Sequence, residues 1–560
     1  MDQFLKKRDE KSTDPCQYKE KCVRKNAHHF IEYAHEHLEN IIKENFSRNK
    51  NEIENYDIPE ELMTNKTVYL DQIKIINDEF SKPSPELSAK RIKIEVQNDT
   101  QPDVKPIISP EQIQNAQRSA ARQTSSNVLT KLNAAKPYNY FLTTIESSVR
   151  THTDPLSITF QELLDPSLGE IECSVQINYL VELDWLLDQY RQANCLNAPV
   201  LILHGDKEIP TKLSQVTTHF VDLEQGTHHT KIMLFGYKDG SMRVIVSTAN
   251  LRAVDWRNYT QGMWISDRLP PLKSENKAFF DDGESATGFR NDLIIYLEAY
   301  DLTHLDPFIE RIRNTDFSSV NVCLVTSIPG SFDDWTNDYA HGYCRVEWLL
   351  SQHCEPIKNT TPLVVQCSTF GNLANRKDER GWLNEFRNSF RQSNPTGKLP
   401  PVQIIYPTFD NVEGSYDGLV GGGCLRYNKT RHNNQRWVKK MMYQWRADAR
   451  HRTRAMPHLK TYCQCSDNKM FWFILTSANL SKSAWGWKKW KQNEVQVGNY
   501  EAGVMFLPKF VTHTKHFSMD ASDQTTPVFP KLYDIPLTKY NKNDRPYHQD
   551  EALPNDCVTT

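Results

Sequence analysis

The chain has 560 residues, of which 24% are charged and 38% hydrophobic, as expected for a soluble globular protein with more than one domain. Its formal net charge of −3 excludes a global basic excess, so any argument for nucleic-acid binding must rest on local patches. No apolar run is long enough for a signal peptide or a bilayer span, and the 12 cysteines are scattered without a small disulfide framework. These features predict a reduced intracellular protein without membrane contact.

Residues 13–37 combine cysteine, histidine and charge. Cys16, Cys22, His29 and His35 follow the spacing C-x5-C-x6-H-x5-H. Two thiolates and two imidazoles suit tetrahedral zinc, and so short a segment needs a metal in order to fold. The spacing predicts a CCHH zinc finger with one structural zinc, although His28 or His37 is an alternative to a neighbouring ligand. Chance clustering among 12 cysteines and 18 histidines is the competing interpretation.

Residues 38–135 are rich in Lys, Glu, Asn, Gln, Ser and Pro, with few aromatic residues and no sustained period. Such segments bury too little apolar surface to offset the entropy of ordering, so we predict a disordered linker. A short helix is expected to continue from the finger through HEHLENIIKENF. The segment AKRIK matches the pattern of a nuclear-localisation signal with low specificity.

After about residue 136 the residue pattern is that of a globular domain. Apolar runs such as APVLILHG, RVIVST, TPLVVQC and FWFILTS indicate buried strands, and stretches such as QINYLVELDWLLDQYRQ and GWLNEFRNSFRQ indicate helices. This alternation predicts an α/β class of layered fold. Asp239 and Gly240 lie between two apolar runs and predict a hairpin turn.

Two segments of this region match each other: HHTKIMLFGYKDGSMRVIVSTANL and PHLKTYCQCSDNKMFWFILTSANL. Each has His, then Lys two residues later, and Asn after a strand-like run. The separation is identical, since 250 − 229 = 21 and 479 − 458 = 21. One copy would be weak evidence, because a lone His is usually a satisfied core residue. Two copies with equal spacing indicate paired functional sites.

The residue types of the repeat suit phosphodiester chemistry. His and Lys two apart on a strand share a face, and a hairpin brings Asn beside them. Two such halves facing each other surround one phosphate, whose charge the cations and amides stabilise. One histidine attacks phosphorus and the other protonates the leaving oxygen, which requires no metal or other cofactor. The repeat alone does not say which histidine does which.

The matched segments resemble the phospholipase D superfamily and, within it, the tyrosyl-DNA phosphodiesterases. GTHHTK, STANL, DWRNYTQG, AMPHLKTY, TSANLSKSAWG and YEAGVMFLP carry this resemblance, which covers residues 136–548. Other members of the superfamily have Asp where this chain has Gly236 and Cys465, which argues against lipid hydrolysis. The resemblance implies two similar α/β/α sandwich halves with pseudo-twofold symmetry, 136–325 and 326–560, and an active site at their seam.

The resemblance also implies individual roles. His229 is the expected nucleophile, and His458 the expected general acid and then base. Lys231, Lys460, Asn250 and Asn479 are expected to hold the phosphate, with Gln261 and Glu501 orienting the histidines. Expected DNA contacts are Ser368, Thr369, Asn372 and Ser481. The finger resembles poly(ADP-ribose)-binding zinc fingers, which implies that Tyr18 and Arg24 contact ADP-ribose.

The implied function is DNA repair. A monomeric nuclear enzyme is expected to hydrolyse the 3′-phosphotyrosyl bond between DNA and a tyrosyl peptide of trapped type IB topoisomerase I, leaving a 3′-phosphate. A phospholipase D-like nuclease or lipid phosphodiesterase, and an inactive poly(ADP-ribose)-binding scaffold, are the alternatives. Residues 426–454 carry ten Arg or Lys and one Asp, with interleaved aromatic residues, and suit either a single-stranded DNA contact or a solvated helix face.

Overall fold

The computed structural model describes most of residues 128–551 and parts of the N-terminal region. The described N-terminal residues are 14–15, 33–47, 56–59, 66, 69–70 and 72–74. The later segment is interrupted at 207–208, 210, 212, 274–281, 333–339, 359, 374–380, 392–397, 490–493 and 522–525. Residues 1–109 and 110–560 are two separate compact units.

The first unit contains a short folded region beyond the predicted finger. Strands β1 (Asp14–Pro15) and β2 (Tyr33–Ala34) pair in parallel, and α3 (Glu36–Ser47) forms the helix expected there. The buried side chains Leu38, Ile41 and Ile42 of α3 pack with four others, Tyr56, Ile58, Tyr69 and Ile73. The linker prediction for 38–135 is therefore wrong at its N-terminal end. These apolar residues are spread over short separate segments, so no single window shows a period.

The linker prediction is also wrong at its C-terminal end. Helix α7 (Val128–Ala134) buries Val128 and Leu132 against the first half of the second unit. Lys131 is only 4% exposed, donates to the Ser157 carbonyl at 2.8 Å and pairs with Glu162 at 2.6 Å. A paired and hydrogen-bonded lysine can be buried, which a composition argument does not anticipate.

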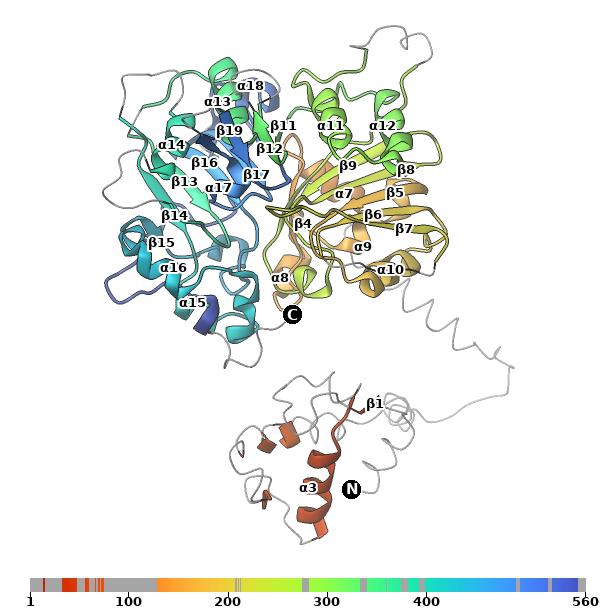
Figure 1. Ribbon diagram of the computed structural model, residues 1–560, viewed down its shortest axis with the longest axis vertical. Coiled ribbons are helices and arrows are strands. Elements are labelled where there is room, and N and C mark those ends of the chain that lie inside the picture. Colours follow the sequence, from red (N-terminus) through yellow and green to blue (C-terminus); the bar gives the residue numbers. More distant parts are fainter. Residues whose placement is uncertain are drawn as a thin grey trace, which may run out of the picture. The chain divides into compact units, whose positions relative to one another are not determined.

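Two large sheets organise the second unit and have the same topology (Figure 1). The first has the order β4-β3-β10-β9-β8-β5-β6-β7, and the second β11-β20-β17-β16-β13-β14-β15. Each contains a central hairpin, with three mutually parallel strands on one side and two antiparallel strands on the other; the first sheet has one extra edge strand, β4, which is parallel to β3. The predicted pair of similar α/β halves is thus confirmed.

The strands of the first sheet are β3 (Tyr140–Thr143), β4 (Ser157–Ile158), β5 (Ile171–Ile177), β6 (Val200–His204), β7 (Val216–Phe220), β8 (Ile232–Tyr237), β9 (Met242–Ser247) and β10 (Gly262–Ile265). Those of the second are β11 (Cys323–Ser327), β13 (Leu363–Gln366), β14 (Val402–Ile405), β15 (Met442–Tyr443), β16 (Thr461–Ser466), β17 (Lys469–Thr476) and β20 (Glu501–Phe506), with β21 (Phe517–Ser518) beside β17. Strand β11 belongs to the second sheet, so the predicted boundary at 325 falls inside a strand and is corrected to before Cys323. A strand start cannot be separated from the preceding loop by composition alone.

Helices flank the sheets of both halves (Figure 1). In the first half these are α8 (Val149–His152), α9 (Phe160–Leu163), α10 (Leu183–Gln192), α11 (Phe289–Glu298) and α12 (Asp306–Arg313). In the second they are α13 (Gly342–His353), α14 (Trp382–Ser389), α15 (Phe409–Glu413), α16 (Lys429–Asn434), α17 (Lys482–Trp485) and α18 (Pro508–Val511). The short strands β12 (Gly330–Phe332), β18 (Trp487–Lys489) and β19 (Glu494–Val497) form a separate small sheet. No described helix combines the length and apolar character that crossing a membrane requires.

The two halves share one hydrophobic core. Side chains of the first sheet, such as Tyr140 and Trp264, and of the second, such as Leu475 and Phe506, belong to the same buried cluster. Gly262 permits this approach, since a Cβ there would lie 2.7 Å from the Tyr140 hydroxyl and 2.8 Å from Leu475 Cδ1. The seam between the sheets is therefore as tightly packed as a domain interior.

We expect Gly262→Ala to lower the free energy of unfolding by about 1–3 kcal/mol, because the added methyl overpacks the seam. Chemical denaturation followed by fluorescence measures the change. The Tyr140 hydroxyl is buried without a hydrogen-bond partner among the described residues. Tyr140→Phe therefore removes one of the atoms that the new methyl would meet, at little cost in stability. The cost of Gly262→Ala should fall in that background; equal costs in both would show that the Tyr140 hydroxyl is not what resists the methyl.

Candidate active site

Each repeated segment enters a central hairpin of its sheet. His229 and Lys231 lie in the extended chain just before β8, and Asn250 follows β9. The ladder of the hairpin continues past its strands, because the Ser247 amide donates to the Lys231 carbonyl at 2.9 Å. The hairpin thus brings the asparagine back beside its His-x-Lys.

The second repeat is built in the same way. His458 and Lys460 precede β16, Asn479 follows β17, and the Thr476 amide donates to the Lys460 carbonyl at 3.0 Å. Each lysine also donates from Nζ to the carbonyl of the histidine two residues before it. The predicted local arrangement of His, Lys and Asn is present in both halves.

Backbone hydrogen bonds fasten each histidine to the opposite half. The His229 amide donates to the Tyr500 carbonyl at 3.0 Å, and the His458 amide donates to the Thr260 carbonyl at 2.9 Å. Tyr500 directly precedes β20, and Thr260 lies two residues before β10. The residue that follows each carbonyl acceptor, in the opposite half, therefore lies beside the histidine that donates to it.

Those next residues are Glu501 and Gln261, as the resemblance implied. The Nδ1 atom of His229 lies 2.9 Å from Glu501 Oε2, and Nδ1 of His458 lies 3.1 Å from Gln261 Oε1. A carboxylate and an amide oxygen both accept, so each Nδ1 carries a proton that it donates. Nε2 of each ring then remains for substrate chemistry.

Glu501 is held firmly. Its side chain is 3% exposed and accepts from Ser477 Oγ at 2.5 Å and Asn499 Nδ2 at 3.0 Å, besides His229. Burial alone would raise the pKa of this carboxyl, yet His229 and the two other donors hold it below the ordinary value of 4.5. Glu501 is therefore ionised at neutral pH.

The two lysines and two histidines of the site all have lowered pKa values. Burial lowers the pKa of Lys231 to about 7, helped by the Lys460 charge, and burial lowers the pKa of Lys460 to about 8. Burial also lowers the pKa of His229, against the opposing charge of Glu501, and lowers that of His458 well below 6.5. The arrangement disfavours positive charge unless an anion is present, which is a property of a phosphate site.

Asn479 is oriented by the loop after β13. Its Oδ1 accepts from the Ser368 amide at 3.2 Å, the Ser368 hydroxyl at 3.2 Å and the Thr369 amide at 3.1 Å. Its Nδ2 is left to donate elsewhere. Two predicted DNA contacts, Ser368 and Thr369, thus lie beside a predicted phosphate ligand.

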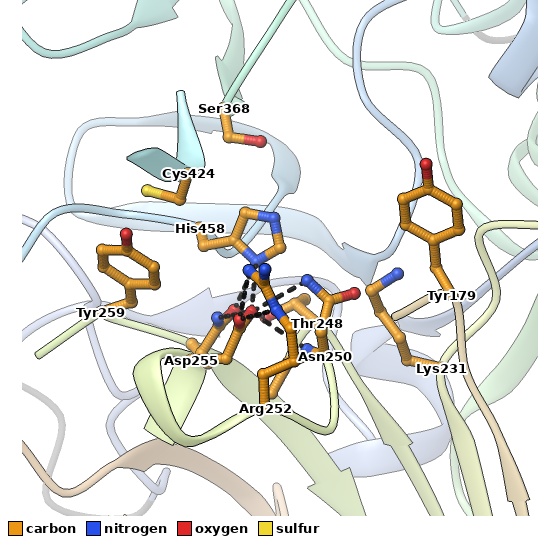
Figure 2. A network of polar contacts seen from close by, with 12 residues as sticks. Tyr179, Lys231, Thr248, Asn250, Arg252, Asp255, Tyr259, Ser368, Cys424 and His458 are labelled. Atoms are coloured by element: carbon orange, nitrogen blue, oxygen red, sulfur yellow. Dashed lines mark hydrogen bonds and ion pairs between the residues drawn. The ribbon is translucent and has the colours of Figure 1, made fainter. Parts of the chain in front are cut away.

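Asn250 is oriented by a residue that the sequence did not single out. Asp255 Oδ1 accepts from Asn250 Nδ2 at 2.9 Å and from Gln261 Nε2 at 3.1 Å, while Oδ2 accepts from Arg252 Nε at 3.1 Å and Nη2 at 2.9 Å. Figure 2 shows these contacts converging below His458, whose Nδ1 is 3.6 Å from Asp255 Oδ1. Asp255 lies within the DWRNYTQG segment, but its role depends on a turn that no periodicity reveals.

Tyr179 is a second residue that sequence reasoning missed. It follows β5, as Ser368 follows β13, and its ring centroid lies 5.7 Å from Lys231 Nζ and 5.6 Å from the His229 ring centroid. Figure 2 places it on the Lys231 side of the site, opposite Tyr259 and Cys424. The only available signal was its position at the end of a buried strand.

The two adjacent histidines of GTHHTK separate into different environments. His228 is 2% exposed and faces the core, where Nε2 lies 3.0 Å from the Tyr300 hydroxyl. Burial lowers its pKa to about 3. His228 is therefore a neutral packing residue, and His229 is the one that faces the site.

The weaker predicted DNA contacts have different surroundings. Asn372 lines a polar cavity of about 250 Å³ with Arg431 and Gln435. Ser481 Oγ instead accepts from the Ala484 amide at 3.4 Å and caps α17. Within 426–454, Trp445 is fully buried, so this aromatic residue cannot stack on a base.

Most of the predicted finger lies outside the described residues, including Cys16, Cys22, His29, Tyr18 and Arg24. His35 is described and is 1% exposed. The register pairs Pro15 with Ala34, the residues that directly precede Cys16 and His35. No group of three or more metal-binding side chains occurs among the residues that the structure describes, so the zinc ligands stay a prediction.

Comparison with known proteins agrees with the family resemblance of the sequence motifs. Residues 139–541 match the family model described as tyrosyl-DNA phosphodiesterase, and residues 13–38 match that of the PBZ domain. The chain is 40% identical to tyrosyl-DNA phosphodiesterase 1 of Drosophila melanogaster, over 96% of this chain and 99% of the fly protein. It is 32% identical to the Arabidopsis thaliana protein of the same name, over 61% of this chain and 58% of the plant protein.

A crystal structure of the yeast tyrosyl-DNA phosphodiesterase has a similar fold, with a TM-score of 0.55 at 19% identity, covering 73% of this chain and 99% of the yeast chain. The family match spans both repeats and every residue of the crossed histidine pairs. The chain therefore belongs to the tyrosyl-DNA phosphodiesterase family.

Proposed function

We propose that this enzyme hydrolyses the 3′-phosphotyrosyl bond between DNA and a trapped type IB topoisomerase through a covalent phosphohistidine, leaving a 3′-phosphate. The observation that carries this proposal is the crossed pair of histidines, each with Nδ1 held by the other half. The Nε2 atoms of both histidines are then free to react with one phosphate bound between Lys231 and Lys460. DNA repair is the function of the family to which the chain belongs.

In the first step, Nε2 of His229 attacks phosphorus while Glu501 accepts the Nδ1 hydrogen bond and stabilises the growing positive charge. A P–N bond forms and the bond from phosphorus to the tyrosyl oxygen breaks. His458, protonated at Nε2, gives that proton to the leaving oxygen. Lys231 and Lys460 stabilise charge on the non-bridging oxygens.

In the second step, neutral His458 takes a proton from water at Nε2, and the water oxygen attacks phosphorus. The P–N bond breaks and its electron pair returns to His229, which restores the free imidazole. The DNA leaves with a 3′-phosphate, and His458 is protonated for the next cycle. All proton transfers therefore use side chains of this chain.

We further propose that the N-terminal finger binds poly(ADP-ribose) and directs the enzyme to DNA breaks in the nucleus. The match to the PBZ domain supports this role. Cys16, Cys22, His29 and His35 would hold the zinc, which supplies folding stability to the finger and takes no part in the hydrolysis. Tyr18 and Arg24 are the proposed ADP-ribose contacts.

Replacing His458 with Asn should trap the covalent intermediate. Tyrosine can leave without full protonation, whereas water needs the base, so hydrolysis of the adduct should slow by roughly 10²-fold or more and exceed any loss in its formation. Single-turnover reactions with a 3′-phosphotyrosyl oligonucleotide, resolved on denaturing gels, measure both steps. His229→Ala in the same background should abolish the adduct, and an adduct that persists would assign the nucleophile elsewhere.

Glu501→Gln should shift the acid limb of the kcat/KM profile to lower pH. Burial lowers the pKa of His229 and the Glu501 charge opposes that effect, so removing the charge lowers this pKa further. Since neutral His229 is the nucleophile, activity then persists to more acidic pH, although the plateau falls. Ser477→Ala is the matched control, because it removes a hydrogen bond to Glu501 and keeps the charge; its acid limb should stay in place.

Chelation should separate the two activities of the chain. After dialysis against a strong zinc chelator, binding to poly(ADP-ribose) should be lost, because the finger cannot fold without its metal. Cleavage of a 3′-phosphotyrosyl oligonucleotide should change less than about twofold, since the proposed steps use imidazole and lysine only. Loss of cleavage that zinc restores would contradict the metal-free mechanism, and Tyr18→Ala tests the ADP-ribose contact without chelation.

A further inference from the structure

Asp255 is the most heavily hydrogen-bonded group of the site that the proposed mechanism does not use. Its side chain is 1% exposed and accepts from Asn250, Gln261 and Arg252. The Asn250 backbone amide also donates to it at 3.2 Å. A buried carboxylate with this many donors is fixed in one orientation.

The Gln261 amide has two chemically different ends, and its neighbours decide which end faces His458. Nε2 donates to Asp255, while Oε1 accepts from Thr248 Oγ1 at 2.9 Å and faces His458 Nδ1. Asp255 accepts only, so the reversed amide would place an oxygen against a carboxylate. The reversal is therefore strongly disfavoured.

We propose that Asp255 is a positioning residue which, through the Gln261 amide, fixes the His458 tautomer that exchanges protons with the substrate at Nε2. This inference rests on the function proposed above. If the amide were reversed, its N–H would face Nδ1 and require a lone pair there. The neutral ring would then carry its proton on Nε2 and could not act as a base toward water.

The second repeat has no carboxylate at the position that matches Asp255. Counted from the asparagine of each repeat, Arg252 and Asp255 correspond to Ser481 and Ala484, and both segments then reach Trp at the sixth position. The second half instead supplies the carboxylate of Glu501, which contacts His229 directly. Both ends of a carboxylate are oxygens, so it has no reversed orientation. Asp255 instead acts through an amide, with its charge offset by the two hydrogen bonds from Arg252.

The two histidines consequently have different environments suited to different roles. A direct carboxylate stabilises the charge that forms on His229 when it becomes bonded to phosphorus. His458 keeps the same Nδ1–H tautomer with only a neutral acceptor in direct hydrogen-bond contact, so its protonated form remains a readier proton donor. The asymmetry favours His458 as acid and base, which the sequence repeat could not decide.

The test compares the two chemical steps in the full-length protein carrying Asp255→Asn. An oligonucleotide with a 3′-(4-nitrophenyl) phosphate reports formation of the adduct as a burst of nitrophenolate, which leaves without a proton. Gel analysis of the same reaction reports hydrolysis of the adduct, which needs His458 as a base. We expect adduct hydrolysis to slow by roughly 10²-fold and the burst rate to fall much less, by the part that Asn250 loses in both steps when its anionic acceptor is removed.

A second variant separates positioning from folding. Asp255→Asn combined with Gln261→Glu moves the carboxylate into direct contact with His458, where no amide can reverse, and should recover adduct hydrolysis by at least about tenfold over the single variant. Equal slowing of both steps in Asp255→Asn, unchanged hydrolysis, or no recovery in the double variant would overturn the inference. A wild-type protein that releases no nitrophenolate at all would instead defeat the proposed function itself.

Discussion

The active site depends on two backbone hydrogen bonds that cross between the halves, from the His229 amide to Tyr500 and from the His458 amide to Thr260. Each fixes a histidine against the strand that carries its partner, Glu501 or Gln261. Neither half holds a complete set by itself, so the site exists only when the two sheets pack. This explains why the seam is a continuous hydrophobic core.

Within this symmetric frame, small differences in sequence separate the roles of two identical side chains. The strands, the hairpins and the His-Lys-Asn sets correspond, yet one half supplies a carboxylate to the opposite histidine and the other supplies an amide backed by Asp255. Two imidazoles in equal surroundings would have equal basicity and could not divide the work of nucleophile and acid. The asymmetry is therefore part of the chemistry.

The repeated motifs and the hairpins could be predicted from the sequence, because they depend on residue spacing and local periodicity, which can be read from the sequence itself. His229, Lys231 and Asn250 could be grouped because one hairpin brings them together. Asp255 and Tyr179 could not, since their proximity to His458 and Lys231 arises from a turn and from the end of a strand. The small core around Ile41 and Tyr56 was missed for a similar reason, because its residues come from separate short segments.

The electrostatics of the site link binding to catalysis. Burial lowers the pKa of Lys231 to about 7 and of Lys460 to about 8, and it keeps His458 mostly neutral at the same pH. A phosphate diester brings a negative charge to the middle of these groups, and an opposite charge at this range raises each of their pKa values. The substrate therefore promotes the protonation of the lysines that hold it and of the histidine that must donate a proton. A ligand without that charge gains little from the same site, so the buried cations select for phosphate esters as well as stabilising their transition state.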